Sequence, residues 1–313
     1  MTSLNRAFTR LRMRRRYEAW FLRFGLADGS GAWWFRYLLT NPGRAGCDLA
    51  GGAPVQVWAT WFPRGGQPET FIQDFPVSAL RMGPRRETFF LEAGPNRIEE
   101  NSCRGTLDVR GQRISWDLRY GSEFGTTLSN KGWIGFSRTP HSDAVFSGEV
   151  RLGEQVFRSD PLGFGLQGHN CGFRHRNFWT WMHACFPQAD GTMSTLEALV
   201  YEMPFGLVFR KAVLWHRGRS VEFRQMRETR RDRSGLGWSF TATAAGETIE
   251  VEVEGGGASL HRLPYVKTDC SGTFEASNNS RATTRVICKL RGEQVEFVTG
   301  DEAVLEMTGE YPG

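Results

Sequence analysis

Residues 17–39 read YEAWFLRFGLADGSGAWWFRYLL, two aromatic-rich apolar runs joined by the turn-forming sequence Asp28-Gly29-Ser30-Gly31. Short runs of aromatic and β-branched residues between Gly, Pro, Asp and Asn are typical of β-strands and tight turns. The same texture continues along the chain, with turn signals at intervals of about 8–15 residues and almost no helical periodicity. The stretch therefore predicts an antiparallel hairpin, and the chain as a whole predicts an all-β fold.

Further turns indicate an up-and-down arrangement of strands. Turn-forming residues at 109–112, 217–219 and 245–247 each separate two apolar runs. Such connections favour hairpins over long crossovers. We expect consecutive strands to pair with one another in most of the chain.

The two halves of the chain resemble each other. Trp20, the turn at 27–29 and the run 33–39 recur as Trp181, the turn at 189–191 and the run 193–201, an offset of about 161 residues. Chance similarity of two aromatic hairpins is the alternative. We predict a duplicated β unit with a boundary near 148–153, so that a basic lead-in (1–16) precedes two units at 17–150 and 151–313. Each unit is expected to form a barrel or a strongly curved sheet, packed around a hydrophobic pocket.

The first 16 residues contain six Arg and no acidic residue. A transit peptide, a nucleic-acid arm and a solvated lead-in all fit this composition, and we favour the solvated lead-in. No apolar run is long enough for a membrane helix, and the N-terminus lacks the apolar region of a secretory signal, so we expect a cytoplasmic protein.

Charge and cysteine usage argue against several classes of protein. The chain has 39 basic and 34 acidic residues, and the basic run 224–233 also contains Glu228 and Asp232, so we expect no nucleic-acid partner. The six Cys form no C-x-x-C pair, and we expect reduced, mostly buried thiols. Phosphate-binding loops, dinucleotide fingerprints, nucleophile elbows and zincin motifs are missing from the sequence.

The densest block of polar residues is GFGLQGHNCGFRH at 163–175, followed by FWTWMH at 178–183. Glycines bracket His169 and Asn170, which lets the backbone approach other groups closely. The period of two in a strand places Trp179, Trp181 and His183 on one face, so that His183 lies at the end of a Trp ladder. His169, Cys171, His175 and His183 match no common zinc spacing, and we expect no metal site.

The block at Gly168–Gly172 with Trp179 and Trp181 resembles the Gly-His-Asn-Trp-Gly motif of a lipocalin-like superfamily. That superfamily includes carotenoid 1,2-hydratases (hydroxyneurosporene synthases), tocopherol cyclases, AttH-like proteins and fungal lipocalin-like Diels–Alderases. The hairpin at 17–37 and the strand at 114–118 also resemble it. The resemblance implies two lipocalin-like, calycin-type β halves around a pocket for a hydrophobic substrate, with no metal or organic cofactor. Cys171 stands at the motif's usual Trp, and Gly168 at the position of an Asp in hydratase-like members.

We therefore expect an enzyme that binds a polyene, isoprenoid or polyketide-like molecule and directs a hydration, cyclisation, isomerisation or pericyclic step. Because Gly168 replaces the hydratase acid, a buried Glu could serve as general acid, with Glu18, Glu197 and Glu202 as candidates. The expected catalytic set is His169, Asn170, His183 and Glu202, and the expected substrate-binding set is Trp20, Trp34, Cys171, Trp179, Trp181 and Glu197. A non-catalytic carrier of a hydrophobic molecule is the alternative. A peripheral membrane contact for substrate delivery and the oligomeric state stay open.

Overall fold

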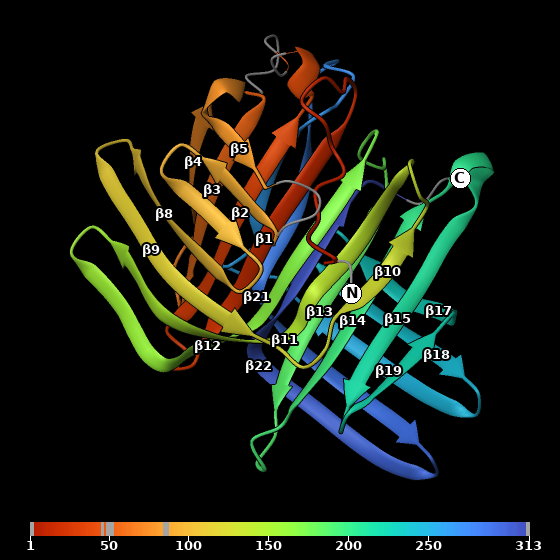
Figure 1. Ribbon diagram of the computed structural model, residues 1–313. Helices are drawn as coiled ribbons and strands as arrows, with labels where there is room; N and C mark the ends of the chain where they lie inside the picture. The colour runs from red at the N-terminus through yellow and green to blue at the C-terminus, as the bar shows by residue number, and fades with distance from the viewer. Residues whose placement is uncertain (1–2, 45–46, 48–52, 84–87, 311–313) are drawn as a thin grey trace.

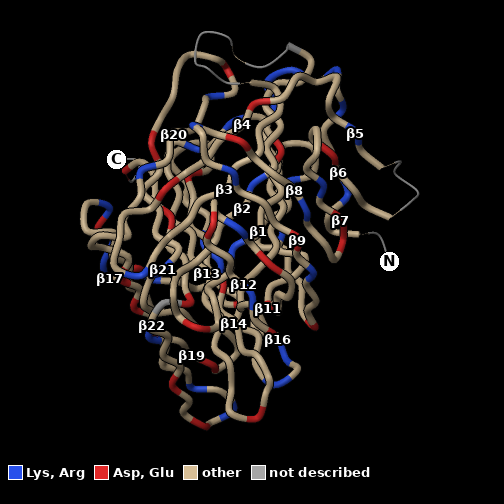
Figure 2. The backbone as a smooth tube through the Cα atoms, turned by 90° about the vertical axis from the view of Figure 1, so that its left-hand side faces the viewer, with Lys and Arg blue, Asp and Glu red and all other residues tan. Residues whose placement is uncertain are grey.

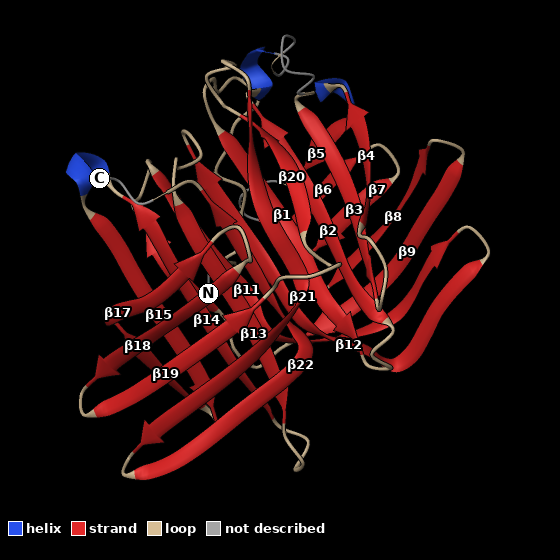
Figure 3. Ribbon diagram, turned by 180° about the vertical axis from the view of Figure 1, so that it is seen from behind, coloured by secondary structure: helices blue, strands red, loops and turns tan. Residues whose placement is uncertain are grey.

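A computed structural model describes residues 3–44, 47, 53–83 and 88–310 (Figure 1). Within these residues there is no α-helix, and the helical segments are the short 3-10 turns η1, η3 and η4 at Pro42–Arg44, Val77–Ala79 and Pro204–Gly206. All strand pairs are antiparallel, and two curved sheets lie side by side (Figure 3). The predicted all-β class is confirmed.

The first sheet has 12 strands in the order β4-β3-β2-β1-β12-β11-β9-β8-β7-β6-β5, with β10 paired to β11. Its strands are β1 Tyr17–Leu26, β2 Gly31–Thr40, β3 Val55–Pro63, β4 Glu69–Phe75, β5 Leu80–Met82, β6 Phe90–Ala93, β7 Asn96–Glu99, β8 Ser102–Val109, β9 Gln112–Gly121, β10 Thr126–Asn130, β11 Gly135–Leu152 and β12 Gln155–Gly172.

The second sheet has 10 strands in the order β16-β15-β14-β13-β22-β21-β19-β18-β17, with β20 paired to β21. Its strands are β13 Trp179–Pro187, β14 Met193–Glu202, β15 Val208–His216, β16 Arg219–Phe223, β17 Gln225–Asp232, β18 Gly237–Ala244, β19 Glu247–Glu254, β20 His261–Val266, β21 Thr273–Leu290 and β22 Glu293–Thr308. The order repeats that of the first sheet, with β13 in the place of β1 and β22 in the place of β12. The topology therefore supports the duplication inferred from the two hairpins.

The change from one sheet to the other comes later than the expected boundary at 150/151. The turn between β11 and β12 falls there, at Gly153, and β12 then runs back along β1 from Gly163 opposite Leu26 to Gly172 opposite Tyr17. An added Cβ at Gly165 would lie 1.9 Å from the main-chain oxygen of Arg23, so only glycine permits this approach. The first sheet consequently extends to Gly172, and the second begins at Trp179.

Three apolar cores follow from the alternation of side chains. On β1, Trp20, Leu22 and Phe24 point into the first sheet, whereas Ala19 and Phe21 point toward the second sheet. The second sheet has its own interior, which contains Met182 from β13. Because both faces of β1 and β2 are covered, these strands read as continuous apolar runs instead of alternating ones.

Residues 3–9 of the N-terminal segment are not solvated as expected, whereas residues 10–15 are mostly exposed. The indole N–H of Trp20 donates to the main-chain oxygen of Asn5 at 2.9 Å, and the N–H groups of Phe8 and Thr9 donate to Glu18 at 2.7 and 2.6 Å. Residues 3–9 thus cover one end of the first sheet, because main-chain bonds to buried partners outweigh a polar composition.

Two cysteines form a disulfide, which corrects the expectation of six reduced thiols. Cys47 and Cys270 are bonded, at a sequence separation of 223 residues. Such a pair has no local sequence signature, because the duplicated topology brings the two segments together. The other four cysteines are free and buried, as expected. Among the described residues no helix is long and apolar enough to cross a membrane.

The basic run at 224–233 lies mostly on β17 and pairs with carboxylates, as expected from its interspersed acids. Arg224 bonds Glu222 at 3.1 Å, and Arg230 bonds Glu254. Blue basic and red acidic segments lie close together around β17 in Figure 2.

Candidate active site between the two sheets

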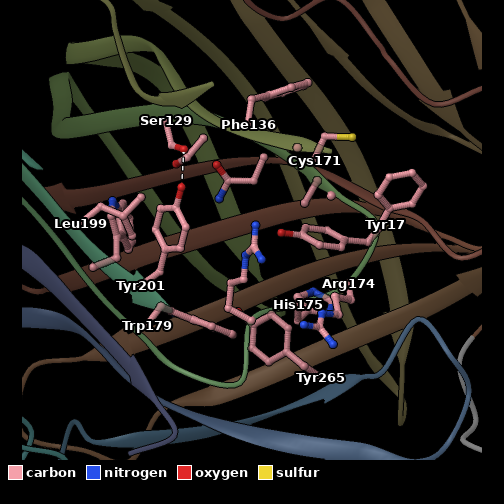
Figure 4. Close-up of a pocket in the computed structure, with 18 of the residues that line it drawn as sticks. Tyr17, Ser129, Phe136, Cys171, Arg174, His175, Trp179, Leu199, Tyr201 and Tyr265 are labelled. Carbon is pink, nitrogen blue, oxygen red and sulfur yellow. Dashed lines mark hydrogen bonds between the residues drawn. The ribbon is translucent and has the colours of Figure 1, made fainter. Parts of the chain in front are cut away.

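A cavity of about 290 Å³ lies between the outer faces of the two sheets. Its wall is rich in aromatic residues, and Figure 4 shows the side chains converging from different strands. The aromatic lining residues are Tyr17, Phe21, Trp34, Phe136, Phe173, Trp179, Trp181, Tyr201 and Tyr265. Pockets of this kind hold an apolar ligand body, while a few polar groups fix its orientation.

Arg36 on β2 is the buried cation of the wall, and it forms no ion pair within the described residues. It is 5% exposed, and its Cζ lies 4.5 Å from the ring centroid of Tyr265 and 5.2 Å from that of Trp58. Its Nη1 has no hydrogen-bond partner, and no carboxylate pairs with it among the described residues. Because a buried guanidinium without an acceptor is costly, an anionic or carbonyl oxygen of a ligand would complete this environment.

Glu306 on β22 is the acid of the cavity. It accepts hydrogen bonds from the indole of Trp179 at 3.1 Å, the hydroxyl of Tyr265 at 3.0 Å and the amide of Asn278 at 3.1 Å. Burial raises the pKa of Glu306, and Arg36 opposes this rise. The carboxyl group consequently keeps its proton to a higher pH than an exposed Glu does, which suits a general acid.

His175 and Tyr17 form a stacked pair in the wall, with ring centroids 4.0 Å apart. Both ring nitrogens of His175 are buried without a partner. Burial, aided by Arg36, lowers the pKa of His175 to about 3, so the imidazole is neutral at physiological pH. Burial raises the pKa of Tyr17 to about 12, so its hydroxyl stays a donor.

Asn170 and Tyr201 complete the polar part of the wall. The Oδ1 atom of Asn170 is buried and has no partner, whereas the hydroxyl of Tyr201 bonds Ser129 at 2.8 Å (Figure 4). Unbonded acceptors and donors therefore surround the same apolar space.

Five of the ten residues predicted from the sequence border this cavity: Trp34, Asn170, Cys171, Trp179 and Trp181. The thiol of Cys171, however, lies on the same face of β12 as His169 and accepts a hydrogen bond from Arg16 at 3.1 Å. The expectation that His169 shares the cavity wall with Asn170 is wrong, because adjacent residues of a strand point to opposite faces. His169 and Trp20 point into the first sheet, where their rings stack at 4.6 Å.

His169 is fully enclosed by partners inside the first sheet. Its Nδ1 donates to the main-chain oxygen of Leu4 at 2.8 Å, and its Nε2 is hydrogen-bonded to Oε1 of Glu18 at 2.8 Å. Burial by itself raises the pKa of Glu18, but the bonds from His169, Thr9 and Phe8 outweigh it and lower the pKa. The polar side-chain atoms of His169 and Glu18 all have hydrogen-bond partners, as in a buried network that stabilises the fold.

His183 and Glu197 lie between the sheets but do not line the cavity. His183 shares a face with Trp179 and Trp181, as predicted, and donates from Nε2 to the main-chain oxygen of Ser142 at 2.7 Å. Burial lowers the pKa of His183 to about 3.

Glu197 lies opposite His183 on β14 and behind Trp181, away from the cavity. It accepts from the indole of Trp181 at 2.9 Å and from Thr139 at 2.8 Å, and burial raises its pKa to about 7. Glu202 follows Tyr201 on β14, so its side chain points to the opposite face, and it does not line the cavity.

Sequence reasoning missed Arg36 and Glu306, and it considered His175 only for a metal site that it then rejected. Arg36 could have been found, because the alternation that puts Trp34 toward the second sheet puts Arg36 there too. Glu306 had no such signal, since its neighbours come from distant strands. No group of three His, Cys, Asp or Glu side chains that could hold a metal ion occurs in the part of the chain that the structure describes.

At the level of sequence, neither a protein-family model nor a curated protein matches the chain. Solved structures are similar in fold. CghA has a TM-score of 0.62 at 11% identity, covering 95% of this chain and 89% of its own. Kievitone hydratase from Nectria haematococca has a TM-score of 0.59 at 11% identity, with coverage of 94% and 89%. A putative AttH from Nitrosomonas europaea has a TM-score of 0.52 at 12% identity, with coverage of 95% and 93%. The chain therefore shares the fold of these three proteins over nearly its whole length, as the motif resemblance implied.

Proposed function

We propose that the protein is an enzyme of the lyase or isomerase type that acts on a hydrophobic, conjugated small molecule held between its two sheets. The observation that carries this proposal is Arg36, a buried guanidinium without an acceptor, in an aromatic cavity that also contains Glu306. The aromatic walls would bury a polyene, isoprenoid or polyketide-like body and hold it in one reactive conformation. The similarity in fold to a kievitone hydratase favours hydration among the possible reactions.

The two charged groups suggest how such a step would proceed. For a carbon–carbon double bond conjugated to a carbonyl group, water forms a bond to the β-carbon and the π electrons move onto the carbonyl oxygen. Arg36 would stabilise the resulting enolate, as preorganised donors do in many enzymes. The α-carbon then takes the proton of Glu306, and the proton released by the attacking water returns to that carboxylate. A pericyclic step would need Arg36 to polarise the carbonyl but no proton transfer to carbon.

A carrier of the same ligand is the second candidate. The bonds that Glu306 accepts from Trp179, Tyr265 and Asn278 favour it, because a carboxylate with three donors can serve as a fixed part of the wall.

Mass spectrometry of hydrophobic molecules that copurify with the protein would supply candidate ligands, and each would be incubated in deuterated water. For an enzyme of the proposed type, Glu306→Gln should lower turnover by about 10²–10⁴, the usual range for a general acid, and leave ligand affinity nearly unchanged. Arg36→Met should lower affinity or turnover at least about tenfold, the worth of a charge-assisted hydrogen bond.

Deuterium on carbon would support hydration or isomerisation, and conversion without deuterium would support the pericyclic step. If the protein binds the ligand tightly without converting it, and Glu306→Gln does not change this affinity, the result would support a carrier instead of an enzyme.

A further inference from the structure

Two turns that line the cavity, and a third turn that follows the lining residue Tyr201 at the end of β14, expose large apolar side chains. They are residues 131–134 after β10, residues 173–177 after β12 and residues 203–207 around η4. We call these three turns together the rim. Five of the nine exposed large apolar side chains of the described residues lie in the rim: Trp133, Ile134, Phe173, Phe205 and Leu207. Scattered single residues of this kind are common on protein surfaces, but a cluster around a cavity marks an interaction site.

Direct contacts join the first two turns, and the second also contacts the strand that leads into the third. Phe173 packs edge-on against Trp133, with ring centroids 5.2 Å apart, and its N–H donates to Ile134 at 3.3 Å. Arg176 lies 5.3 Å from the ring of Tyr201, at the end of β14, just before the third turn. The end of β10 and the coil of η4 lie toward the same upper end of the molecule in Figure 1.

Phe205 is the most exposed of these side chains, at 99%, and Leu207 beside it is 59% exposed. The backbone of Phe205 has φ 65°, a left-handed conformation that bulky residues rarely adopt. The turn is closed by a bond from the N–H of Met203 to the oxygen of Leu207 at 2.7 Å. A fixed turn thus holds an aromatic ring entirely in solvent, at a conformational cost that packing within this chain does not explain.

All charged side chains of the rim are basic. The three turns contain Lys131, Arg174 and Arg176 and no Asp or Glu. None of these three side chains forms an ion pair within the described residues. Exposed aromatic and aliphatic side chains interspersed with cations are the pattern that binds the boundary between headgroups and acyl chains.

We propose that the rim docks on an anionic membrane surface, with Phe205, Leu207 and Trp133 entering the boundary between headgroups and acyl chains. Lys131, Ile134, Phe173, Arg174 and Arg176 also line the cavity, so its mouth would face the bilayer. A hydrophobic ligand could then pass between bilayer and cavity without crossing water. This inference concerns the surface and does not depend on which reaction the cavity catalyses.

Cosedimentation with lipid vesicles tests the proposal. The full chain should bind phosphatidylcholine vesicles that contain about 30% phosphatidylglycerol more tightly than vesicles of pure phosphatidylcholine, and salt at about 0.5 M should weaken this preference. The double variant Phe205→Ser/Leu207→Ser should lower the partition coefficient at least about tenfold, because it removes two inserted apolar groups. Val298→Ser is the matched control, since Val298 is 67% exposed on β22 outside the rim, and it should bind as the wild type does.

Quenching by brominated lipids gives a second readout, because the quenching should fall in Trp133→Phe. Binding to neither vesicle type, or equal loss of binding in the Val298 control, would overturn the proposal. A wild-type dimer that Phe205→Ser/Leu207→Ser converts to a monomer, measured by light scattering, would assign the rim to a second copy of the chain and overturn it as well.

Discussion

His169 and Asn170 are neighbours on β12, yet they face two different environments. Inside the first sheet, His169 and Glu18 bond each other and main-chain groups of the N-terminal segment. In the cavity between the sheets, Asn170 Oδ1 and Arg36 Nη1 have no partner, nor do the two ring nitrogens of His175. Buried polar side chains whose donors and acceptors all have hydrogen-bond partners stabilise a fold. Side chains with unpartnered polar atoms beside an open apolar cavity can instead bind the polar groups of a ligand. The difference separates His169, whose ring nitrogens are both hydrogen-bonded, from Asn170, whose Oδ1 faces the cavity unpartnered.

The largest effect on stability should come from the completed pair. His169→Ala removes one member of a buried pair and leaves the Glu18 carboxylate without its partner, which typically costs about 3–5 kcal/mol of unfolding free energy. Urea denaturation would measure it. If the unfolding free energy changes by less than about 1 kcal/mol while turnover is selectively lost, His169 would instead be a catalytic residue.

Much of this organisation follows from local sequence patterns. The hairpin at 17–39 and the later hairpins depend on turn residues between apolar runs, which act over short distances, and the structure contains these hairpins. The face on which His169 lies depends on strand register, which a glycine-bracketed motif does not reveal. The Cys47–Cys270 disulfide and the approach of Glu306 to Arg36 depend on contacts between segments far apart in the sequence, and no spacing in the sequence encodes them.

A second effect, of intermediate size, concerns pH and distinguishes Glu197 from Glu18. Burial raises the pKa of Glu197 to about 7, above its ordinary value near 4.5, so the folded state holds a proton that the unfolded state has lost between these two values. Stability from this group is therefore full below about pH 4.5 and falls as the pH rises to about 7, by about 3 kcal/mol. Glu197→Gln should abolish this decline in unfolding free energy.

Glu18 should act in the opposite direction, because its pKa is lowered in the folded state. Its contribution is present above the ordinary pKa of a Glu and is lost as the pH falls through the folded value. Denaturation curves between pH 4 and 8 that are identical for wild type and Glu197→Gln would contradict the assignment of the decline to Glu197.

The smallest effect should come from Asn170→Ala, the matched counterpart of the substitution at His169. Because Oδ1 of Asn170 has no partner in the wall, its removal should change the unfolding free energy by less than about 1 kcal/mol. Affinity for the cavity ligand should fall about fivefold, the equivalent of one neutral hydrogen bond at about 1 kcal/mol. Calorimetric titration and urea denaturation of the same variant measure both quantities. A destabilisation as large as that of His169→Ala, with affinity unchanged, would mean that both faces of β12 are structural, and the contrast between them would fail.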